Sequence, residues 1–270
     1  MDGSRAQSSS VRPASVRLGR INWGNVARVS DTLSRSWRLF RGFLREQSDP
    51  DGFYRLLAAD SAWQVDQWHR LAGARLLDVG GGPGYFSDAF EGAGATYFAL
   101  DADAGEMRLH GRQPGPRTVQ GSGLGLPFGD ATMDIAYSST VLEHVSQPWQ
   151  LANEMVRVTR PGGIIFVSYT LWWGPWGGHE TSPFHYLGGD RAARRYLRKH
   201  GHPPKNHFGQ SLFPVTAAAG LNWARGCEGA ELVAAFPRYL PSWATPLERV
   251  PYLREVLTWN LVLVLRKSDA

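Results

Sequence analysis

Cysteine is nearly absent from this chain of 270 residues, which contains only Cys227. A single cysteine excludes an internal disulfide and points to a reducing compartment. Residues 1–30 contain no continuous apolar segment, so we expect no secretory signal. Residues 161–178 carry no charge, but their glycines and prolines argue against a membrane-spanning helix. These absences predict a cytoplasmic protein, and the chain length suits one large domain with additions.

Acidic residues are scarce at the start of the chain. Residues 1–45 contain nine arginines against only Asp2 and Asp31, whereas the whole chain has a net charge of +5, so the remaining body is slightly acidic. A basic body would suggest that the protein binds nucleic acid. Because the body of this chain is slightly acidic, we expect no nucleic-acid partner. A basic leader on an acidic body suggests contact with an anionic surface or a solvated arm.

The basic leader divides into two segments. Residues 1–27 are rich in serine and arginine with little periodicity, and we predict that they are disordered. A helix is then predicted, with Asp31 as its N-cap. Its apolar positions are Leu33, Trp37, Phe40 and Leu44, and the arginines expected on the opposite side are Arg35, Arg38, Arg41 and Arg45. Two interpretations stay open: the apolar stripe packs on the main domain, or residues 31–47 lie on the inner, anionic face of a membrane.

A second helical stretch follows the leader. It begins at Asp49–Pro50 and runs to about Leu71, with Asp60–Ser61 as a candidate break within it. Helices placed before a cofactor-binding domain commonly cover the mouth of its site. We therefore predict that residues 28–72 form an N-terminal helical cap over the site.

From residue 73 onwards the chain alternates between apolar strands and helices. Strands are predicted at 75–80, 96–101, 117–121, 133–138, 163–169, 231–237 and 257–266. Helices are predicted at 84–93, 104–110, 148–159 and 214–225, with Pro161–Gly163 ending the third of them. This alternation predicts an α/β fold in which residues 73–267 form a Rossmann-like, seven-stranded, doubly wound sheet with a final hairpin.

Residues 171–210 interrupt the alternation. They contain Trp172, Trp173 and Trp176, five of the eight histidines, and a short helical segment at Asp190–Arg198. This insertion follows the carboxyl end of a strand, which is where open α/β sheets bind their ligands. We therefore predict that residues 171–210 form a lid over the substrate.

A glycine-rich turn occupies residues 76–86, LLDVGGGPGYF. Gly80, Gly82 and Gly84 permit a tight turn and a close ligand approach, and the helix that follows offers free N–H groups. The dinucleotide fingerprint has its third glycine one position later. Asp78, at the strand end, would repel a pyrophosphate but attract an ammonium group. The spacing resembles motif I of the class I S-adenosylmethionine (SAM) methyltransferases.

Further segments extend this resemblance. Asp101 ends the next strand about twenty residues after Gly80, where an acid can accept hydrogen bonds from both ribose hydroxyls. The segments GSGLGLPF (121–128), MDIAYSS (133–139) and VLEHV (141–145) are similar to a pattern of the large methyltransferase group that includes quinone and sterol methylating enzymes. The segments HYLGG and PRYLP are similar to uncharacterised actinobacterial members of that group.

The resemblance implies SAM as the cofactor and suggests which residues hold it. Asp78 and the glycine turn would hold the methionine end, and Asp101 would hold the ribose. Ala102 would lie against the adenine. The backbone carbonyl of Ser138 would meet the amino group of the cofactor.

One position departs from the family pattern. Ser122 stands where the family usually has an aspartate that receives the adenine amino group. A serine hydroxyl still accepts this hydrogen bond, although a charged acceptor is typically stronger. The Gly123 N–H would still face the ring, so the resemblance implies that cofactor binding survives.

Methyl transfer from a sulfonium mainly requires in-line positioning and exclusion of water, but a hydroxyl acceptor also needs a base. The candidates are His144, near the exit of the fourth strand, and His179, Glu180, His185 and Tyr186 in the insertion. In the family, Glu143–His144 often shapes the pocket without transferring a proton. No metal ligand is assigned: His200, His202 and His207 have a spacing that could bind a metal, but an exposed polar loop is the simpler interpretation.

These patterns predict an O-methyltransferase whose acceptor is a small molecule, glycan or lipid with a sugar-like or lipid-linked hydroxyl. The tryptophans of the insertion offer flat apolar faces that stack on sugar rings or cover acyl chains. One alternative is C-methylation of a quinone or polyprenyl ring, which the LEHV segment equally resembles. An alternative of another class is a SAM-binding protein without turnover, which an intact glycine turn and a full lid disfavour.

Overall fold

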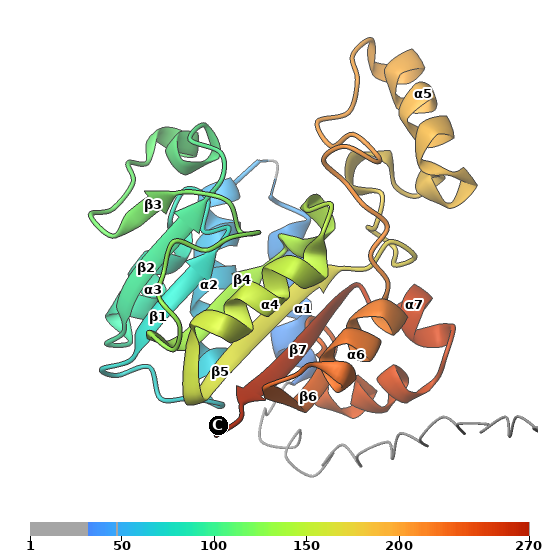
Figure 1. Ribbon diagram of the computed structural model, residues 1–270. Coiled ribbons are helices and arrows are strands. Elements are labelled where there is room, and N and C mark those ends of the chain that lie inside the picture. Colours follow the sequence, from blue (N-terminus) through green and yellow to red (C-terminus); the bar gives the residue numbers. More distant parts are fainter. Residues whose placement is uncertain (1–31, 47, 270) are drawn as a thin grey trace, which may run out of the picture.

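One mixed sheet of seven strands organises the computed structural model, which describes residues 32–46 and 48–269 (Figure 1). The strand order is β3-β2-β1-β4-β5-β7-β6, and β7 runs antiparallel to both of its neighbours. The strands are β1 (Arg75–Val79), β2 (Thr96–Asp101), β3 (Thr118–Gln120), β4 (Met133–Ser139), β5 (Thr159–Thr170), β6 (Ala230–Pro237) and β7 (Asn260–Lys267). The predicted Rossmann-like, seven-stranded α/β fold is confirmed.

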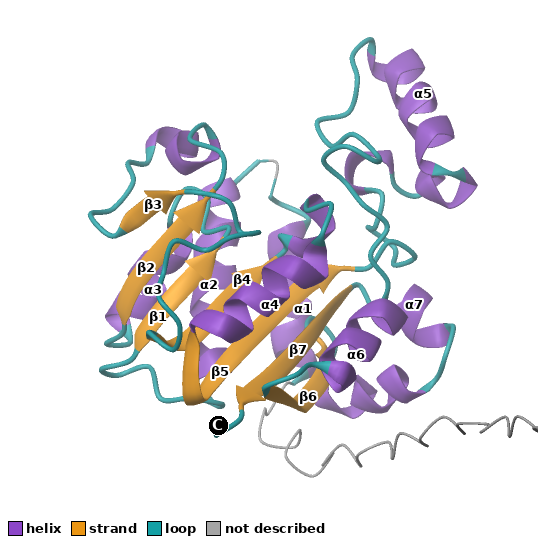
Figure 2. Cartoon of the chain, viewed as in Figure 1, coloured by secondary structure: helices purple, strands orange, loops and turns teal. Residues whose placement is uncertain are grey.

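Helices cover both faces of the sheet (Figure 2). The α-helices are α1 (Leu33–Phe43), α2 (Pro50–Asp66), α3 (Tyr85–Gly92), α4 (Pro148–Val158), α5 (Gly189–His200), α6 (Ala217–Gly226) and α7 (Leu253–Leu257). The 3-10 helices are η2 (Glu106–Gly111), η3 (Leu142–His144), η4 (His179–Thr181), η5 (Phe184–Leu187) and η6 (Ser242–Arg249). None of the helices among the described residues is long and apolar enough to cross a membrane.

The strands are apolar on both faces because each face is covered by helices. Leu77 and Val79 of β1 point into a cluster that contains residues of α4 and α6. Leu76, on the same strand, points into a second cluster formed with α2 and α3. The order of the strands reverses between β1 and β4, and open α/β sheets bind ligands outside the carboxyl ends of the strands at such a point.

Several predicted boundaries are wrong in detail. The fifth strand begins at Thr159, directly after α4, and runs through Pro161–Gly163 instead of starting there. The second helix is continuous through Asp60–Ser61, because the Ser61 hydroxyl donates to the Leu57 carbonyl and the Asp60 carboxylate accepts from side chains. The last strand begins at Asn260 because the preceding residues form α7.

The orientation of α1 also differs from the prediction. Arg35 and Leu39 are buried, at 7% and 1% exposure, whereas Leu33, Trp37 and Leu44 are 60–66% exposed. Arg35 therefore lies on the packed side of the helix and not with the exposed arginines. The reason is a buried ion pair, in which Arg35 Nε and Asp60 Oδ1 are 2.6 Å apart. The predicted N-cap Asp31 and the predicted disordered segment 1–27 lie outside the described residues, and Thr32 caps the helix.

The insertion 171–210 contains η4, η5 and α5. Figure 1 shows α5, in orange, standing beyond the carboxyl end of β5 and clear of the sheet. The predicted helix at Asp190–Arg198 is confirmed as part of α5. The returning chain runs back past η3, where the Phe213 N–H donates to the Glu143 carbonyl at 2.7 Å. The insertion thus contributes to the carboxyl edge of the sheet, where β1 to β5 end.

Candidate active site

The glycine turn adopts backbone conformations that favour glycine. The φ angles of Gly80, Gly82 and Gly84 are +84°, +49° and +75°. At Gly80 a Cβ atom would also overlap the side chain of Val141, which packs directly on the turn. At Gly82 no heavy atom lies within 4 Å of the position of a Cβ, so the turn is open on that side. Space for a ligand therefore exists beside Gly82 but not beside Gly80.

Helix α3 begins at this turn without a side-chain cap. Its N-cap is Gly84, in the left-handed conformation, and this residue makes no side-chain cap. The positive end of a helix dipole favours an anionic group at the helix N-terminus. The carboxylate at the methionine end of SAM is such a group, which agrees with the predicted role of the turn.

A substitution at Gly82 tests whether the open side of the turn receives the cofactor. Gly82→Ala is expected to lower the free energy of unfolding by about 1–2 kcal/mol, because a left-handed φ is unfavourable for alanine. It should also raise the Kd for SAM measured by calorimetry, because the new Cβ enters the open space. Gly73→Ala is the matched control, since Gly73 has φ +82°, has an equally open Cβ position and precedes β1 at the opposite edge of the sheet. Equal losses of affinity in both variants would contradict the assignment.

The side chain of Asp101, the last residue of β2, is hydrogen-bonded to the glycine turn. One carboxylate oxygen accepts a hydrogen bond from the Gly82 N–H and the other from the Asp103 N–H, both at 2.9 Å. The side chain is half-buried, and the following Ala102 is exposed. Asp101 therefore lies at the carboxyl edge beside the turn, where the ribose contact was predicted. That contact and the adenine contact of Ala102 stay predictions.

Asp78 lies beneath the turn and is 2% exposed. The Tyr97 hydroxyl donates to its Oδ2 at 2.6 Å. Burial raises the pKa of Asp78 to about 7; the Tyr97 hydrogen bond opposes this shift, and the charge of Asp101 adds to it. The carboxyl group therefore changes charge near neutral pH. Its predicted contact with the methionine end stays a prediction.

The raised pKa of Asp78 gives its predicted contact a pH signature. Below pH 7 the carboxyl group is mostly neutral, and above pH 7 it is anionic and attracts the cofactor ammonium. We expect SAM to bind about three- to ten-fold more tightly at pH 8 than at pH 6. Asp78→Asn should remove this dependence. Calorimetric Kd values measured across this range check it, and an equally steep dependence in the variant would show that another group is responsible.

The loop carrying Ser122 and Gly123 is held against α4. Ser122 is exposed, and its hydroxyl accepts from the Leu124 N–H at 3.1 Å. Arg157 of α4 donates to the carbonyls of Leu126 and Phe128, both at 2.9 Å. The half-buried Arg157 thus fixes the position of the exposed loop that follows β3. The adenine contacts of Ser122 and Gly123 stay predictions.

Ser138 lies near the carboxyl end of β4 and is fully buried. Its hydroxyl donates to the Val79 carbonyl at 2.8 Å, which ties β4 to the end of β1. Ser138 therefore lies at the reversal point of the sheet, directly before the turn into η3. The predicted contact of its carbonyl with the cofactor amino group stays a prediction.

Two of the five predicted candidates for the catalytic base meet in the structure. The rings of His144 and His179 are nearly perpendicular, with centroids 5.0 Å apart. His144 Nδ1 lies 2.7 Å from the Ser211 carbonyl oxygen. Because a carbonyl oxygen only accepts, Nδ1 carries the hydrogen and Nε2 keeps a lone pair in the neutral ring. Burial lowers the pKa of His179, which favours its neutral form.

Glu143 completes this cluster, although sequence reasoning did not name it as catalytic. Its side chain is buried at 1% exposure, and Oε1 accepts from the Thr170 N–H at 3.0 Å. One ligand-capable atom each from Glu143, His144 and His179 lies within 4.8 Å of the others. The sequence feature that could have identified Glu143 is an acid directly before a histidine, just after the fourth predicted strand. We call these three residues the Glu–His–His cluster.

Glu180 and His185 lie outside the Glu–His–His cluster. Glu180 is exposed and accepts from the Asn206 amide at 2.8 Å. His185 is buried against the indole of Trp172, and burial lowers its pKa. It lines a hollow of about 320 Å³ within the insertion. The other residues that line this insertion hollow are Trp172, Trp173, Leu187, Gly188, Gly189, Asp190, Arg191, Arg194 and Phe208.

The remaining histidines of the insertion are exposed. His200 stacks on Tyr196, and His202 Nδ1 lies 2.9 Å from the Pro203 carbonyl oxygen. Their ring centroids are 6.2 Å apart. Among the described residues, the group of side chains whose spacing suits a metal ion is the Glu–His–His cluster and not this polar loop.

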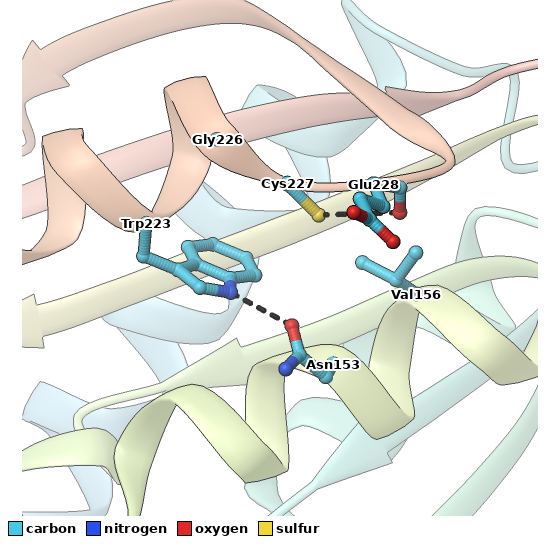
Figure 3. Close-up of a pocket in the computed structure, with 6 residues that line it drawn as sticks. All are labelled: Asn153, Val156, Trp223, Gly226, Cys227 and Glu228. Carbon is cyan, nitrogen blue, oxygen red and sulfur yellow. Dashed lines mark hydrogen bonds between the residues drawn. The ribbon is translucent and has the colours of Figure 1, made fainter. Parts of the chain in front are cut away.

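A further pocket of about 380 Å³ lies between α4 and α6 (Figure 3). Trp223 Nε1 donates to Asn153 Oδ1 at 2.8 Å across it, and Cys227 lies at its end. Its residues lie in the C-terminal parts of α4 and α6 and in the loop between α6 and β6. This is the side of the sheet where β5 and β6 begin, opposite the glycine turn. It therefore does not belong to the cofactor site.

The fold and the carboxyl-edge site define a SAM-dependent methyltransferase, and comparison with known proteins agrees. A family described as a methyltransferase domain matches residues 77–167, which span the glycine turn, Asp101 and the LEHV segment. A SAM-dependent methyltransferase from Mesorhizobium loti shares the fold, with a TM-score of 0.52 and 19% identity. The similarity covers 77% of this chain and 98% of that one.

Mycobacterial proteins are similar over nearly their whole length. An uncharacterized methyltransferase of Mycobacterium avium (strain 104) is 56% identical over 87% of this chain and 96% of its own. An uncharacterized methyltransferase of Mycobacterium tuberculosis (strain H37Rv) is 54% identical over 87% of this chain and 95% of its own. The chain therefore belongs to this methyltransferase family, and SAM is its methyl donor.

Proposed function

We propose that this methyltransferase transfers the methyl group to a hydroxyl of a sugar-like or lipid-linked acceptor. The observation that carries the proposal is the Glu–His–His cluster beside the glycine turn. Val141, which packs on Gly80, is two residues before Glu143, so the cluster lies next to the predicted methionine end of the cofactor. Carbon acids and thiols need less help to react, whereas a hydroxyl with a high pKa needs a group that assists loss of its proton.

The insertion hollow supports the acceptor class. Trp172 and Phe208 form an aromatic wall, with ring centroids 4.9 Å apart. Such faces stack on sugar rings and cover acyl chains. Arg191 and Arg194 line the same hollow and suit an anionic group such as the phosphate of a lipid-linked acceptor. Gly178, directly before His179 of the cluster, packs against the side chain of His185, which lines the hollow, so the hollow lies close to the cluster.

Mass spectrometry of products tests this proposal. Lipid and glycan extracts are incubated with enzyme and SAM carrying a labelled methyl group, and the labelled product is identified. A methoxy carbon on a sugar-like or lipid-linked molecule supports the proposal. A labelled ring methyl on a quinone or polyprenyl ring would establish the C-methylation alternative instead. SAM binding without release of S-adenosylhomocysteine in any extract would indicate a binding protein without turnover.

We also propose that the outer side of α1 holds the enzyme against an anionic membrane, at its inner face. Leu33, Trp37 and Leu44 are exposed although α1 is docked on α2. Three exposed arginines accompany them: Arg38, Arg41 and Arg45. Aromatic and aliphatic side chains beside arginines are the composition of helices that lie in a lipid headgroup region. Such a location would suit a lipid-linked acceptor.

Vesicle sedimentation tests the membrane contact. The double variant Trp37→Ser/Leu44→Ser is expected to bind vesicles containing phosphatidylglycerol roughly ten-fold more weakly than the unaltered chain, because it loses buried apolar area. Added salt should weaken binding of the unaltered chain. Trp243→Ser is the matched control, since this tryptophan of η6 is 70% exposed. The proposal is wrong if the double variant sediments like the unaltered chain.

A further inference from the structure

A carboxylate oxygen is buried beside two imidazole rings without a partner among the described residues. Glu143 Oε2 has no hydrogen-bond partner there, and the Glu143 side chain is 1% exposed. The other oxygen, Oε1, is fixed by the Thr170 N–H of β5. An unpaired buried carboxylate oxygen is unfavourable, and buried charges are normally paired or coordinate a metal. This oxygen therefore indicates a missing cationic partner.

The two imidazole rings present nitrogen lone pairs in the same place. The ligand-capable atoms of Glu143, His144 and His179 all lie within 4.8 Å of one another. His144 donates from Nδ1 to the Ser211 carbonyl, and this leaves Nε2 as a ligand atom. His179 Nδ1 lies 3.4 Å from the Gly177 carbonyl oxygen, which favours the same arrangement. Metal-binding histidines typically use their second nitrogen in this way, to fix ring orientation and tautomer.

We propose that Glu143, His144 and His179 bind one divalent transition-metal ion. Two histidines and one glutamate are the protein ligands of several catalytic zinc sites, in which a further coordination position stays open. Imidazole suits zinc and its neighbours, whereas magnesium and calcium prefer oxygen ligands. Ligand atoms of a tetrahedral zinc ion are about 3.3 Å apart, so side-chain adjustments of roughly 1 Å would bring atoms that lie within 4.8 Å of one another into ligand positions.

The tertiary structure holds each ligand separately. Glu143 and His144 belong to η3, directly after β4, and His179 begins η4 in the insertion. His179 has φ +49°, a conformation unusual for a residue other than glycine, which directs its ring towards η3. Ser211 of the returning chain then fixes the His144 ring. Three separate segments thus converge on one point beside the cofactor turn.

The metal gives the site a means to activate its acceptor, and this role rests on the proposed O-methylation. The acceptor hydroxyl oxygen binds at the open coordination position, where the metal lowers its pKa and its proton leaves to solvent. The oxygen then forms a bond to the methyl carbon of SAM while the carbon–sulfur bond breaks. S-adenosylhomocysteine leaves with that electron pair on sulfur. His144 and His179 act as ligands in this scheme and not as the base.

Calorimetry with Zn²⁺ tests the site without any acceptor. The full chain is treated with EDTA, exchanged into metal-free buffer and titrated with Zn²⁺. We expect one ion per chain, and Glu143→Gln and His179→Ala should each weaken binding at least ten-fold. The far-UV circular dichroism of both variants should match that of the unaltered chain, which shows that they are folded. His202→Ala is the matched control, an exposed histidine of the same insertion whose loss should leave Zn²⁺ binding unchanged.

Co²⁺ provides a second measurement, because its visible absorption reports on bound nitrogen ligands. The unaltered chain should develop these bands, and Glu143→Gln and His179→Ala should lose or shift them. Absence of stoichiometric Zn²⁺ binding, or equal affinity in both variants and the unaltered chain, would overturn the site. So would loss of binding in His202→Ala alone.

Product analysis separates this inference from the proposed function. Formation of a methoxy product at an unchanged rate by EDTA-treated enzyme would overturn the metal's role and leave O-methylation standing. A ring-methylated product from an enzyme that still binds Zn²⁺ would overturn O-methylation and leave the metal site standing. Loss of methoxy formation with EDTA and its return with Zn²⁺ or Co²⁺ supports both.

Discussion

Asp60→Ala is expected to lower the free energy of unfolding by about 3–5 kcal/mol, because it removes the counter-ion of a buried guanidinium. Arg35 binds the Asp60 carboxylate through Nε and Nη2, both at 2.6 Å, and both side chains are buried. The same guanidinium reaches the Arg238 carbonyl at 3.2 Å. The ion pair therefore joins α1 to α2 and to the end of β6.

A second buried cation increases the expected effect. Arg238 is fully buried, and its guanidinium donates to the hydroxyls of Ser61, Ser139 and Ser168 at 2.5–2.6 Å. The charge of Asp60 is among the influences that raise the pKa of Arg238, although burial acts in the opposite direction. Removal of Asp60 thus leaves two guanidinium groups in the core without its negative charge.

Urea denaturation measures this change in the free energy of unfolding, and two further variants serve as controls. The double variant Arg35→Met/Asp60→Leu should recover most of the loss, since apolar replacements of buried ion pairs are often neutral. Glu91→Ala breaks the half-exposed pair between Glu91 and Arg117 and should cost no more than about 1 kcal/mol. A loss below about 1 kcal/mol for Asp60→Ala would mean that the buried pair contributes little to docking of α1.

Asp101→Ala is expected to weaken SAM binding by about 1–3 kcal/mol, through loss of charge-assisted hydrogen bonds to the ribose hydroxyls. The carboxylate also accepts from the Gly82 N–H at 2.9 Å, so part of the loss reflects a less ordered glycine turn. Calorimetry at fixed pH and salt measures the change in Kd.

Two variants make the Asp101 result specific. Asp101→Asn keeps an acceptor oxygen but removes the charge, so its Kd should lie between those of Asp101→Ala and the unaltered chain. Asp190→Ala removes an exposed aspartate of α5 in the insertion and should leave the Kd unchanged. Unchanged affinity in Asp101→Ala would show that the ribose is held elsewhere.

Much of the sheet and the conformation of the glycine turn were predictable, because the sequence patterns that specify them are local. The apolar strands and the glycines at 80, 82 and 84 reflect backbone requirements that each segment carries by itself. Asp101 could be placed because parallel strands end at the same edge of a sheet. Boundaries were less predictable: the continuity of α2 through Asp60 depends on a partner 25 residues earlier in the chain, Arg35.

The buried side of α1 was not predictable from periodicity. Hydrophobic spacing set Leu33, Trp37 and Leu44 on the side of α1 opposite Arg35 and left open whether that side packs on the domain. In the structure these three residues are exposed and Arg35 is buried. A charged side chain enters a core only where a partner of opposite charge is already held there, and that partner lies on another helix. No pattern within residues 32–46 contains this information.

The motifs along the chain were sufficient to identify the class of enzyme and the cofactor. The glycine turn, Asp101 and the LEHV segment are short stretches whose chemistry is set by neighbours in the chain. The tertiary structure alone decided that Glu143 and His144 meet His179, 35 residues later, and that Ser211 orients the pair. The physical reason is that a cluster of ligand atoms needs convergence within a few ångströms. The path of the insertion out from β5 and back past η3 brings about that convergence.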